Sequence, residues 1–479
     1  MIRFPYSRSS RRVGVIAAAV LAVSAAPALA ADGVLDATFD GDGRVTTSFP
    51  TNLGFPTLAT FSGVAVQPDG KVVAIGTVRF ANGVSRMIVA RYTTNGSPDS
   101  SFGGGRVLID FPNSWDLDGR DLVLLPGGDI VIVGTIHNGA VASDSAIALA
   151  RLRGSGPSAG RLDPLFGTGG LAVQAPVQRR SSSVPSGSII FEQGTGIVLA
   201  AGGTRLLVSG TGQSGGRNVV VTAVFDLQGQ PVDRGPALPG NLDVTSTPLF
   251  ANHGGPHDVA PYRAGGLVTV STADGTGLGL LAVDADGFAQ ARDGGPFDNH
   301  IGMGSARWLA RFAGASDTVD SAVAADPTAE RWVEVGSTFV GGVARTVVAR
   351  FTANGLDRSF SADGTALFDL PGVSWGQDVA VQRDGKIVIA SQSSGRIALL
   401  RLLPDGEPDR SFGSDGLVLD DVPGSNLDSV FGVAIGADGK AVVAGADVAA
   451  GGERRFLVER YGPQSLFLPC GSLLGCLKP

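Results

Sequence analysis

Short hydrophobic runs alternate with turn residues along this chain, and the same pattern returns at regular intervals. The segment Val64–Gly76 reads Val-Ala-Val-Gln-Pro-Asp-Gly-Lys-Val-Val-Ala-Ile-Gly. Close copies occupy Val379–Ala390 and Val433–Gly445, and weaker copies lie at Leu122–Gly134, Ile197–Gly210, Val259–Ser271 and Ala322–Gly336. Runs of this length, rich in Val, Ile and Ala and bounded by Gly, Asp and Pro, are typical of β-strands. The chain therefore contains seven copies of one β-unit.

Two more elements follow each copy. A second apolar run ends in a basic-aromatic pair in the better copies, such as Arg91-Tyr92. A turn with the pattern Asp-x-x-Phe comes next in five units: Asp36/Phe39, Asp99/Phe102, Asp163/Phe166, Asp357/Phe360 and Asp409/Phe412. The fourth and fifth units lack this turn. The six steps from Gly70 to Gly439 give a period of about 61 to 62 residues, which is room for four strands and their loops.

One unit is expected to be a four-stranded antiparallel sheet. Pro68-Asp69-Gly70 has the composition of a tight turn, so residues 64–67 and 71–77 should form a hairpin. We expect Arg86–Tyr92 to add the next strand and Gly43–Phe49 to supply the first strand of the unit. Small aliphatic residues on both faces indicate that each sheet packs between two neighbours.

Seven such sheets, each covered on both faces, predict an all-β, seven-bladed β-propeller over residues 31–462. The first unit begins near Asp32 and the seventh ends near Gly462, at the same phase of the repeat, as a closed ring requires. An open solenoid would instead be expected to carry atypical capping repeats.

The N-terminal residues 1–30 have the pattern of an export signal. Four arginines precede residue 13, and an uncharged Ala/Val-rich run follows them and ends with Ala28 and Ala30 at the positions that signal peptidase reads. We expect cleavage there, with an uncleaved membrane anchor as the alternative. The mature chain is then exported to the periplasm, the cell surface or the medium. The tail 463–479 contains both cysteines, Cys470 and Cys476, which an oxidising compartment would allow to form a disulfide.

Composition narrows the class of protein further. Gly contributes 71 of 479 residues, 43% of residues are hydrophobic and 17% are charged, with a net charge of −7. This hydrophobicity excludes a disordered chain, and the acidic balance argues against nucleic-acid binding, which needs an excess of Lys and Arg. No long apolar run follows residue 30, so we expect no transmembrane segment in the mature chain, and we expect a monomer.

The repeated motifs resemble those of a known family. The unit Arg-Tyr-x-x-(Asn/Asp)-Gly-x-x-Asp-x-Ser-Phe-Gly at Arg91–Gly103 is followed in later units by Ala-Val-Gln-x-Asp-Gly-Lys-Ile/Val-Val. Together these motifs resemble the bacterial delta-60 repeat family, a β-propeller domain of unknown function. The resemblance covers about residues 32–462 and is weak in units four and five. It implies a propeller in an exported or surface protein, and it implies no activity and no catalytic residues.

A few residues are candidates for a ligand site. His253 and His257 lie in a Gly-Gly-Pro loop and, with His300, fall in or beside the two degenerate units, where a repeat would diverge to form a site. Trp115 and Trp375 occupy matching places, predicted to lie in links between the first and second strands. Aromatic residues paired on one face suit carbohydrate or peptide ligands, although packing between blades is the simpler interpretation of both tryptophans.

No cofactor is predicted. Asp40-Gly41-Asp42-Gly43 and Asp363-Gly364 are weak calcium patterns that lack the further acidic ligands of a calcium loop, and turn chemistry explains them as well. Two Gly-x-Ser-x-Gly matches lack the strand-turn-helix context of a nucleophile elbow.

We therefore expect a non-catalytic, exported binding or scaffold propeller whose ligand is a protein or a glycan. The alternative is a propeller hydrolase or lyase with its site at the central channel, where polar residues of several blades would converge.

Overall fold

The structure, a computed structural model, describes residues 32–48, 56–112, 116–137, 145–174, 192–214, 217–232, 242–245, 258–271, 275–285 and 308–462. The predicted signal peptide and the tail with Cys470 and Cys476 lie outside these residues, and both remain predictions.

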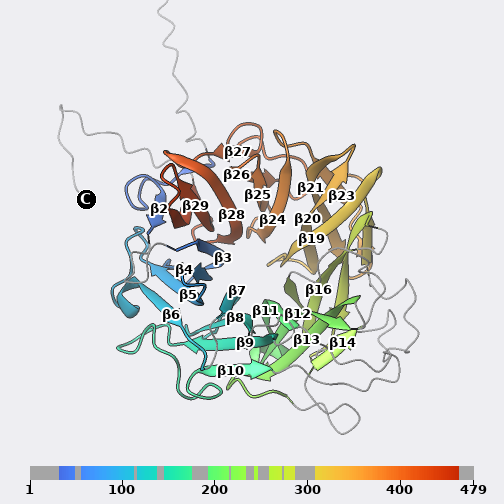
Figure 1. Cartoon of the computed structure of the whole chain (residues 1–479). Coiled ribbons are helices and arrows are strands. Elements are labelled where there is room, and N and C mark those ends of the chain that lie inside the picture. Colours follow the sequence, from blue (N-terminus) through green and yellow to red (C-terminus); the bar gives the residue numbers. More distant parts are fainter. Residues whose placement is uncertain are drawn as a thin grey trace, which may run out of the picture.

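Seven antiparallel sheets are arranged as blades around a common centre (Figure 1), which confirms the predicted seven-bladed propeller. Blade 1 contains β3 (Leu58–Val66), β4 (Val72–Arg79), β5 (Ser85–Tyr92) and β6 (Arg106–Ile109). Blade 2 contains β7 (Asp116–Leu124), β8 (Ile130–His137), β9 (Ser145–Leu152) and β10 (Leu171–Gln174). Blade 3 contains β11 (Glu192–Ala200), β12 (Arg205–Ser214), β13 (Arg217–Asp226) and β14 (Leu242–Thr245). Blade 4 contains β15 (Val259–Tyr262), β16 (Gly265–Ser271), β17 (Gly277–Val283) and β18 (Trp308–Arg311).

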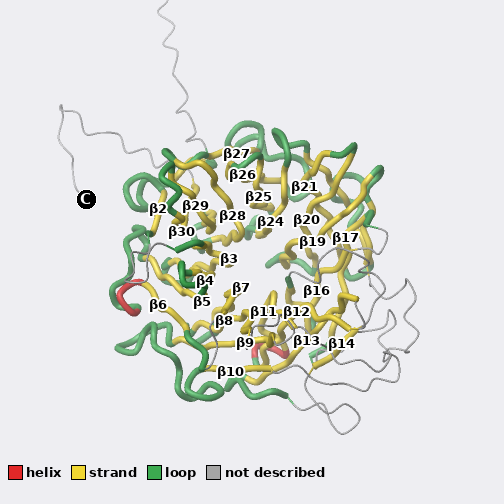
Figure 2. Tube along the Cα trace, viewed as in Figure 1, coloured by secondary structure: helices red, strands yellow, loops and turns green. Residues whose placement is uncertain are grey.

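The remaining blades follow the same order. Blade 5 contains β19 (Ala315–Ala325), β20 (Arg331–Val340), β21 (Val343–Thr352), the two-residue β22 (Gly355–Leu356) and β23 (Thr365–Phe368). Blade 6 contains β24 (Ser374–Val381), β25 (Ile387–Ser393), β26 (Arg396–Leu402) and β27 (Leu417–Asp420). Blade 7 contains β28 (Ser425–Ile435), β29 (Ala441–Ala449) and β30 (Arg454–Gly462), joined by β1 (Val34–Leu35) and β2 (Arg44–Thr47). Two short 3-10 turns, η1 (Gly103–Gly105) and η2 (Ala201–Gly203), are the helical segments in Figure 2.

Strand β2, which falls within the predicted strand Gly43–Phe49, corrects one prediction. Residues 44–47 do not begin blade 1, because β2 pairs antiparallel with β30, with Arg44 opposite Glu459 and Thr47 opposite Phe456. Each blade therefore starts one strand later than the sequence unit, and its outermost strand belongs to the next unit. The N-terminal strand completes the last blade and closes the ring through hydrogen bonds between the two ends of the chain.

The Asp-x-x-Phe turns tie neighbouring blades together. In blade 1, Arg91 donates from Nε to Asp99 Oδ2 at 2.9 Å, and its guanidinium lies 4.4 Å from the centroid of the Phe102 ring. Its Nη1 donates to the carbonyl of Gly154 in blade 2. Lys71, from the Asp-Gly-Lys turn, adds an ion pair to Asp99 at 3.3 Å. We call this set of contacts the arginine clasp.

The clasp recurs wherever the sequence motif is strong. The equivalent sets are Arg151 with Asp163, Arg350 with Asp357 and Phe360, Arg401 with Asp409 and Phe412, and Arg460 with Asp36 and Phe39. Blades 3 and 4 have Val224 and Ala282 at the position of the arginine. The repeated motif is therefore explained by contacts between blades, and blades 3 and 4 lack the arginine that makes these contacts.

The hydrophobic core lies between the blades. Phe61 of blade 1 packs on Phe456 of blade 7 with ring centroids 4.5 Å apart, and similar clusters of buried aliphatic side chains fill other interfaces. The outermost strands have only four residues each, which limits the exposed sheet edge. Within the part of the chain that the structure describes, no helix has the length and apolar character needed to cross a membrane.

Candidate functional site

The innermost strands carry the same irregularity at the same place in six blades. One residue is unpaired in the ladder between the first and second strands of each of these blades, which is a β-bulge. The bulged residues are Ser62, Arg120, Thr195, Ser321, Gln377 and Phe431. We call them the bulge ring. The inner strands surround the centre of the propeller (Figure 1), so these residues lie around its axis.

The bulge ring is exposed although its neighbours are buried. All six bulged residues are exposed or half-buried, whereas the residues directly before them are buried. Phe431 is 37% exposed, and the side chain of Arg120 is 44% exposed. Solvent therefore reaches all six residues, although Ser62 Oγ also donates to the Gly119 carbonyl at 3.0 Å and Thr195 Oγ1 lies 3.3 Å from Ser209 Oγ.

Close packing explains why glycine flanks several bulges. A Cβ on Gly119 would lie 2.5 Å from the carbonyl oxygen of Gly76, and one on Gly376 would lie 2.6 Å from that of Gly336. The bulge thus recurs at one place in six blades, while the bulged residue itself varies in chemistry from hydroxyl to guanidinium, amide and aromatic ring.

Three carboxylates occupy the position that directly follows the bulge in blades 2 and 6 and the equivalent position in blade 4. Asp121, Asp258 and Asp378 come from blades 2, 4 and 6 and stand at equivalent positions of the repeat. Each accepts a hydrogen bond at Oδ1 from the next residue's amide, at 2.7 Å in all three cases. Each also accepts one at Oδ2 from an amide of the following blade: Ile197 at 3.0 Å, Val323 at 3.0 Å and Val433 at 2.6 Å. These axial aspartates fasten blade 2 to 3, blade 4 to 5 and blade 6 to 7.

Burial, and for two of the three also repulsion from a neighbouring carboxylate, raises the pKa values of these acids. Burial raises the pKa of Asp121 to about 6. Burial, together with the charge of Asp121, raises the pKa of Asp378 to about 7. Burial and then the charges of Asp121 and Asp378 raise the pKa of Asp258 well above its usual value. The three carboxyl groups therefore share one electrostatic environment at the axis, and groups that titrate near neutral pH are candidates for a functional site.

The sequence contains a signal for this arrangement that the motif search did not use. An aliphatic residue, such as Val64 in blade 1 or Leu122 in blade 2, recurs at one position of every innermost strand. The residue before it is an aspartate in three blades (Asp121, Asp258 and Asp378) and a small residue in the other four (Gly63, Gly196, Ala322 and Gly432). This alternation of acidic and small residues marks the bridged interfaces. Because the number of blades is odd, acidic and small residues cannot alternate all the way around the ring. The neighbouring blades 7 and 1 therefore both have glycine at this position.

The structure describes one of the five predicted ligand residues. Trp375 is the second residue of the innermost strand β24, not part of a link between strands as predicted. Its ring packs edge-on against Phe339 of blade 5, with centroids 5.6 Å apart and planes at 75°, and it is half-buried. Trp115, His253, His257 and His300 lie outside the described residues.

The weak calcium patterns are turns in the structure. Asp42 Oδ1 accepts the Arg44 amide at 2.9 Å, and Asp363 Oδ1 accepts the Thr365 amide at 2.8 Å. Asp40 has a positive φ of 53° in the same turn as Asp42. No three His, Cys, Asp or Glu side chains of the described segments are grouped so that they could hold a metal ion.

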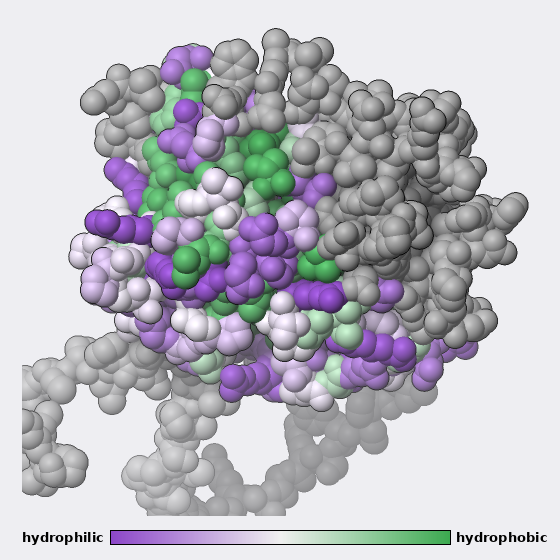
Figure 3. All heavy atoms as spheres, turned by 90° about the horizontal axis from the view of Figure 1, so that it is seen from below, coloured by the Kyte–Doolittle hydropathy of each residue, from purple (hydrophilic) through white to green (hydrophobic). Residues whose placement is uncertain are grey.

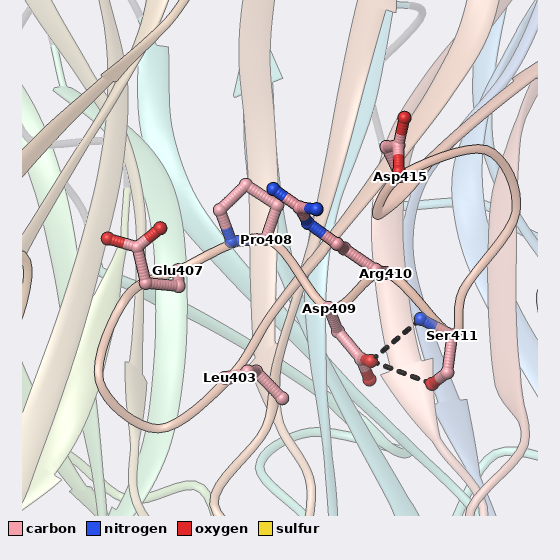
Figure 4. A pocket seen from close by; sticks show the side chains of 7 residues that line it. All are labelled: Leu403, Glu407, Pro408, Asp409, Arg410, Ser411 and Asp415. Carbon is pink, nitrogen blue, oxygen red and sulfur yellow. Dashed lines mark hydrogen bonds between the residues drawn. The ribbon is translucent and has the colours of Figure 1, made fainter. Parts of the chain in front are cut away.

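An open pocket of about 600 Å³ lies at the clasp turn of blade 6 (Figure 4). It is lined by Leu403, Glu407, Pro408, Asp409, Arg410, Ser411 and Asp415. Asp409 accepts hydrogen bonds from the Ser411 amide and hydroxyl at 3.1 and 2.7 Å and pairs with Arg401 and Lys386. Because its only buried charge already serves the clasp, this pocket is a weaker candidate than the axis.

In Figure 3, hydrophilic and hydrophobic residues are interspersed over the described part of the visible face.

The comparisons with solved structures find distant likenesses. The chain has 11% identity and a TM-score of 0.45 to an ulvan lyase of polysaccharide lyase family PL25, covering 88% of this chain and 96% of that one. A protein of unknown function from Dyadobacter fermentans has 10% identity and a TM-score of 0.45, covering 88% and 100%. A regucalcin from Agrobacterium tumefaciens has 11% identity and a TM-score of 0.33, covering 88% and 98%. Likenesses at this level carry no information about activity.

The sequence comparisons are more specific. No curated protein matches the chain. Residues 67–102 and 382–412 match the family model described as "Domain of unknown function (DUF5122) beta-propeller". Both segments contain the clasp lysine, arginine, aspartate and phenylalanine, such as Lys71, Arg91, Asp99 and Phe102 in the first. The chain therefore carries repeats of the DUF5122 beta-propeller family, as the resemblance of its motifs implied.

Proposed function

We propose that this chain is an exported, non-catalytic propeller that binds a ligand at the bulge ring. The observation that supports this is the contrast at the axis between a bulge repeated at one place in six blades and bulged residues of five different types, all exposed or half-buried. In a repeat whose other inner positions are constrained by packing, such variation is expected where each blade contributes a separate ligand contact. Bulges commonly redirect side chains next to binding sites.

The chemistry of the ring favours a glycan. Ser321 carries a hydroxyl group, Gln377 an amide and Arg120 a guanidinium that lies 3.6 Å from Asp118, which together suit a ligand rich in hydroxyl groups. The hydroxyls of Ser62 and Thr195, which bond Gly119 and Ser209, can still accept hydrogen bonds. Phe431 supplies an exposed aromatic surface on which a sugar ring can pack. A protein ligand is the other partner class expected from the sequence, and the experiment below separates the two.

The test uses the mature chain, residues 31–479, and a variant with Arg120→Ala, Gln377→Ala and Phe431→Ala. We expect the wild type to bind some glycans of a glycan array and the triple variant to bind none of them. The circular dichroism and melting temperature of the triple variant should equal those of the wild type. Leu165→Ala, on a side chain that is 75% exposed and lies in the turn Asp163–Phe166 and not on an innermost strand, is the matched surface control. Equal retention by the triple variant would place the binding site elsewhere. Ring-dependent capture of a protein in place of a glycan would favour the protein ligand.

A catalytic role has one observation in its favour. Carboxyl groups with a pKa near 6 or 7, as at Asp121 and Asp378, are suited to proton transfer at neutral pH. Both oxygens of each of these groups already accept backbone amides, so we rank catalysis second. A propeller hydrolase or lyase would be favoured if the wild type depolymerised polysaccharides that it binds on the array. The Asp378→Asn variant should then lose this activity and still bind the same polysaccharides.

A further inference from the structure

A carboxyl group occupies an aliphatic position in one interface between blades. Glu334 lies on β20, opposite Val323, which directly follows the bulge and the small residue of blade 5. The residues at this position in the other six blades are Ala74, Ile132, Val208, Val268, Ile389 and Val443. An ionisable side chain has thus replaced a hydrophobic one in blade 5 alone.

Glu334 is buried without a hydrogen-bond partner. The residue is 0% exposed, and neither carboxyl oxygen has a partner among the described residues. Gly336, two residues further along β20, faces Leu278 of β17, so side-chain alternation directs Glu334 toward blade 4 as well. Burial and the charge of the buried Asp320 raise the pKa of Glu334 well above its usual value. The Gly279 amide partly offsets these effects without meeting the geometry of a hydrogen bond.

Cations on the surrounding strands are engaged elsewhere. On β20 itself, Arg331 pairs with Asp326 at 2.9 Å. On β21, Arg345 pairs with Asp369 at 2.6 Å and Arg350 pairs with Asp357 at 2.9 Å. The other titratable residues of the strands packed on β20 are the acids Asp317 and Asp320 of β19 and Asp378 of β24. Strands β16 and β17 of blade 4 carry no titratable residue.

The interface between blades 4 and 5 lacks the arginine of the clasp and is bridged by the axial Asp258. Blade 4 has Ala282 in place of the clasp arginine. The axial Asp258 crosses the interface through its bond to the Val323 amide. Aromatic packing also joins the two blades: the rings of Trp308 in blade 4 and Trp332 in blade 5 are stacked with centroids 6.2 Å apart, and Trp332 Nε1 donates to the Pro261 carbonyl at 2.9 Å.

We propose that the interface between blades 4 and 5 is a pH-dependent seam, closed while Glu334 is neutral and opened when Glu334 ionises. A neutral carboxyl can remain between β17 and β20. An unpaired carboxylate beside Asp320 in a dry interface is strongly unfavourable, and entry of water between the blades relieves it. Opening at this seam separates the two blades that Asp258 joins, so it changes the axis where the bulge ring lies.

The two stacked tryptophans make the seam measurable. We expect the near-UV circular dichroism of the wild type to lose the signal of the coupled indoles as pH rises from 5 through the raised pKa of Glu334. Over the same range we expect the amides of β17 to lose about tenfold or more of their hydrogen-exchange protection, after correction for the intrinsic rate. In Glu334→Gln both quantities should be independent of pH.

Matched variants make the outcome decisive. Glu459→Gln removes another buried acid, at the interface of blades 6 and 7, and should leave the pH dependence of β17 in place. Should Glu334→Gln fail to fold, Glu334→Val introduces the residue type found in blades 3 and 4. The proposal is overturned if the wild type shows no pH dependence at this interface, or if the Glu334 variants retain it.

Discussion

Arg44 and Glu459 are separated by 415 positions in the sequence, and Arg44 Nε lies 2.5 Å from Glu459 Oε1. The glutamate side chain is fully buried and that of the arginine is 9% exposed. Arg44 also reaches Asp420 of blade 6 at 3.0 Å, and the Tyr461 hydroxyl donates to the same two acids. A buried network thus anchors the N-terminal strand, which has only four residues with which to hold the ring closed.

Removing the arginine should weaken this closure. Arg44→Ala leaves Glu459 buried beside Asp420 without its cation, and losing one partner of a buried pair costs about 3–5 kcal/mol. We expect a loss of this order in the free energy of unfolding from urea titration at pH 7. Arg396→Ala breaks the exposed pair with Asp421 and should cost about 1 kcal/mol or less. Equal effects of the two variants would show that the network does not hold the closure.

The turn before the clasp of blade 6 needs glycine for two separate reasons. Gly406 has a φ of +92°, and a Cβ there would lie 2.9 Å from the ring of Phe360 in the preceding blade. Gly424 has a φ of +77°, with nothing within 4 Å of the corresponding Cβ. Gly424→Ala should therefore cost only the left-handed backbone, about 1–2 kcal/mol, whereas Gly406→Ala adds about 1–3 kcal/mol of overpacking. Thermal melts of the two variants measure the difference, and equal losses would mean that the Phe360 contact is relieved at no cost.

Lysine should not replace the clasp arginine. Arg401 contacts Asp409 through Nε, Ser411 through Nη2 and Asp32 through Nη1, while its guanidinium lies 4.5 Å from the Phe412 centroid. One ammonium cannot make these contacts together, so Arg401→Lys should cost about 1–3 kcal/mol.

Arg410, which directly follows the clasp residue Asp409, provides the control for this substitution. Arg410 is exposed, and Arg410→Lys should change the free energy of unfolding by about 0.5 kcal/mol or less. An Arg401→Lys protein as stable as Arg410→Lys would indicate that the charge alone, and not the planar guanidinium, serves the clasp.

The architecture was accessible from sequence because it is repeated. Seven copies of one hairpin, small residues on both faces and matching ends determine a closed ring of sheets. The assignment of Arg44–Thr47 to the first blade failed because a strand's own residues do not show which sheet it joins. The deciding partner, Glu459, lies at the other end of the chain, and only the closed ring brings the two together.

The candidate site was much less accessible. Motif searching favoured His253, His257, His300 and the tryptophans because those residue types often bind ligands. The bulge ring is defined by a one-residue offset in strand pairing, and residues as ordinary as Ser62 or Gln377 belong to it. Burial raises the pKa of Asp121 and of Asp378, and the charge of Asp121 adds to the effect on Asp378, an environment that only the assembled ring creates.

The acids of this propeller fall into two groups with opposite effects on stability. Burial raises the pKa of Asp99, but hydrogen bonds from Ser101, the charge of Arg91 and Lys71 outweigh it, and the pKa lies at about 2. Corresponding contacts set Asp36 and Asp409 at about 2 as well. An unfolded Asp has a pKa near 4. The stability from these three groups is therefore complete above about pH 4 and is lost as pH falls toward 2.

The raised acids act in the other direction. Asp121 at about 6, and Asp378 and Glu459 at about 7, bind protons in the folded state that the unfolded chain has released. Their contribution is complete below about pH 4 and is lost as pH rises to about 7. We therefore expect the urea midpoint to be highest near pH 4 to 5, to fall steeply below pH 3 and to decline steadily toward pH 7. Asp378→Asn should flatten the decline above pH 5 and leave the acid limb unchanged, whereas Asp99→Asn should do the reverse. A wild-type maximum at pH 7 to 8 would show that the axial carboxyl groups are charged in the folded protein, and the electrostatic account of the axis would then be wrong.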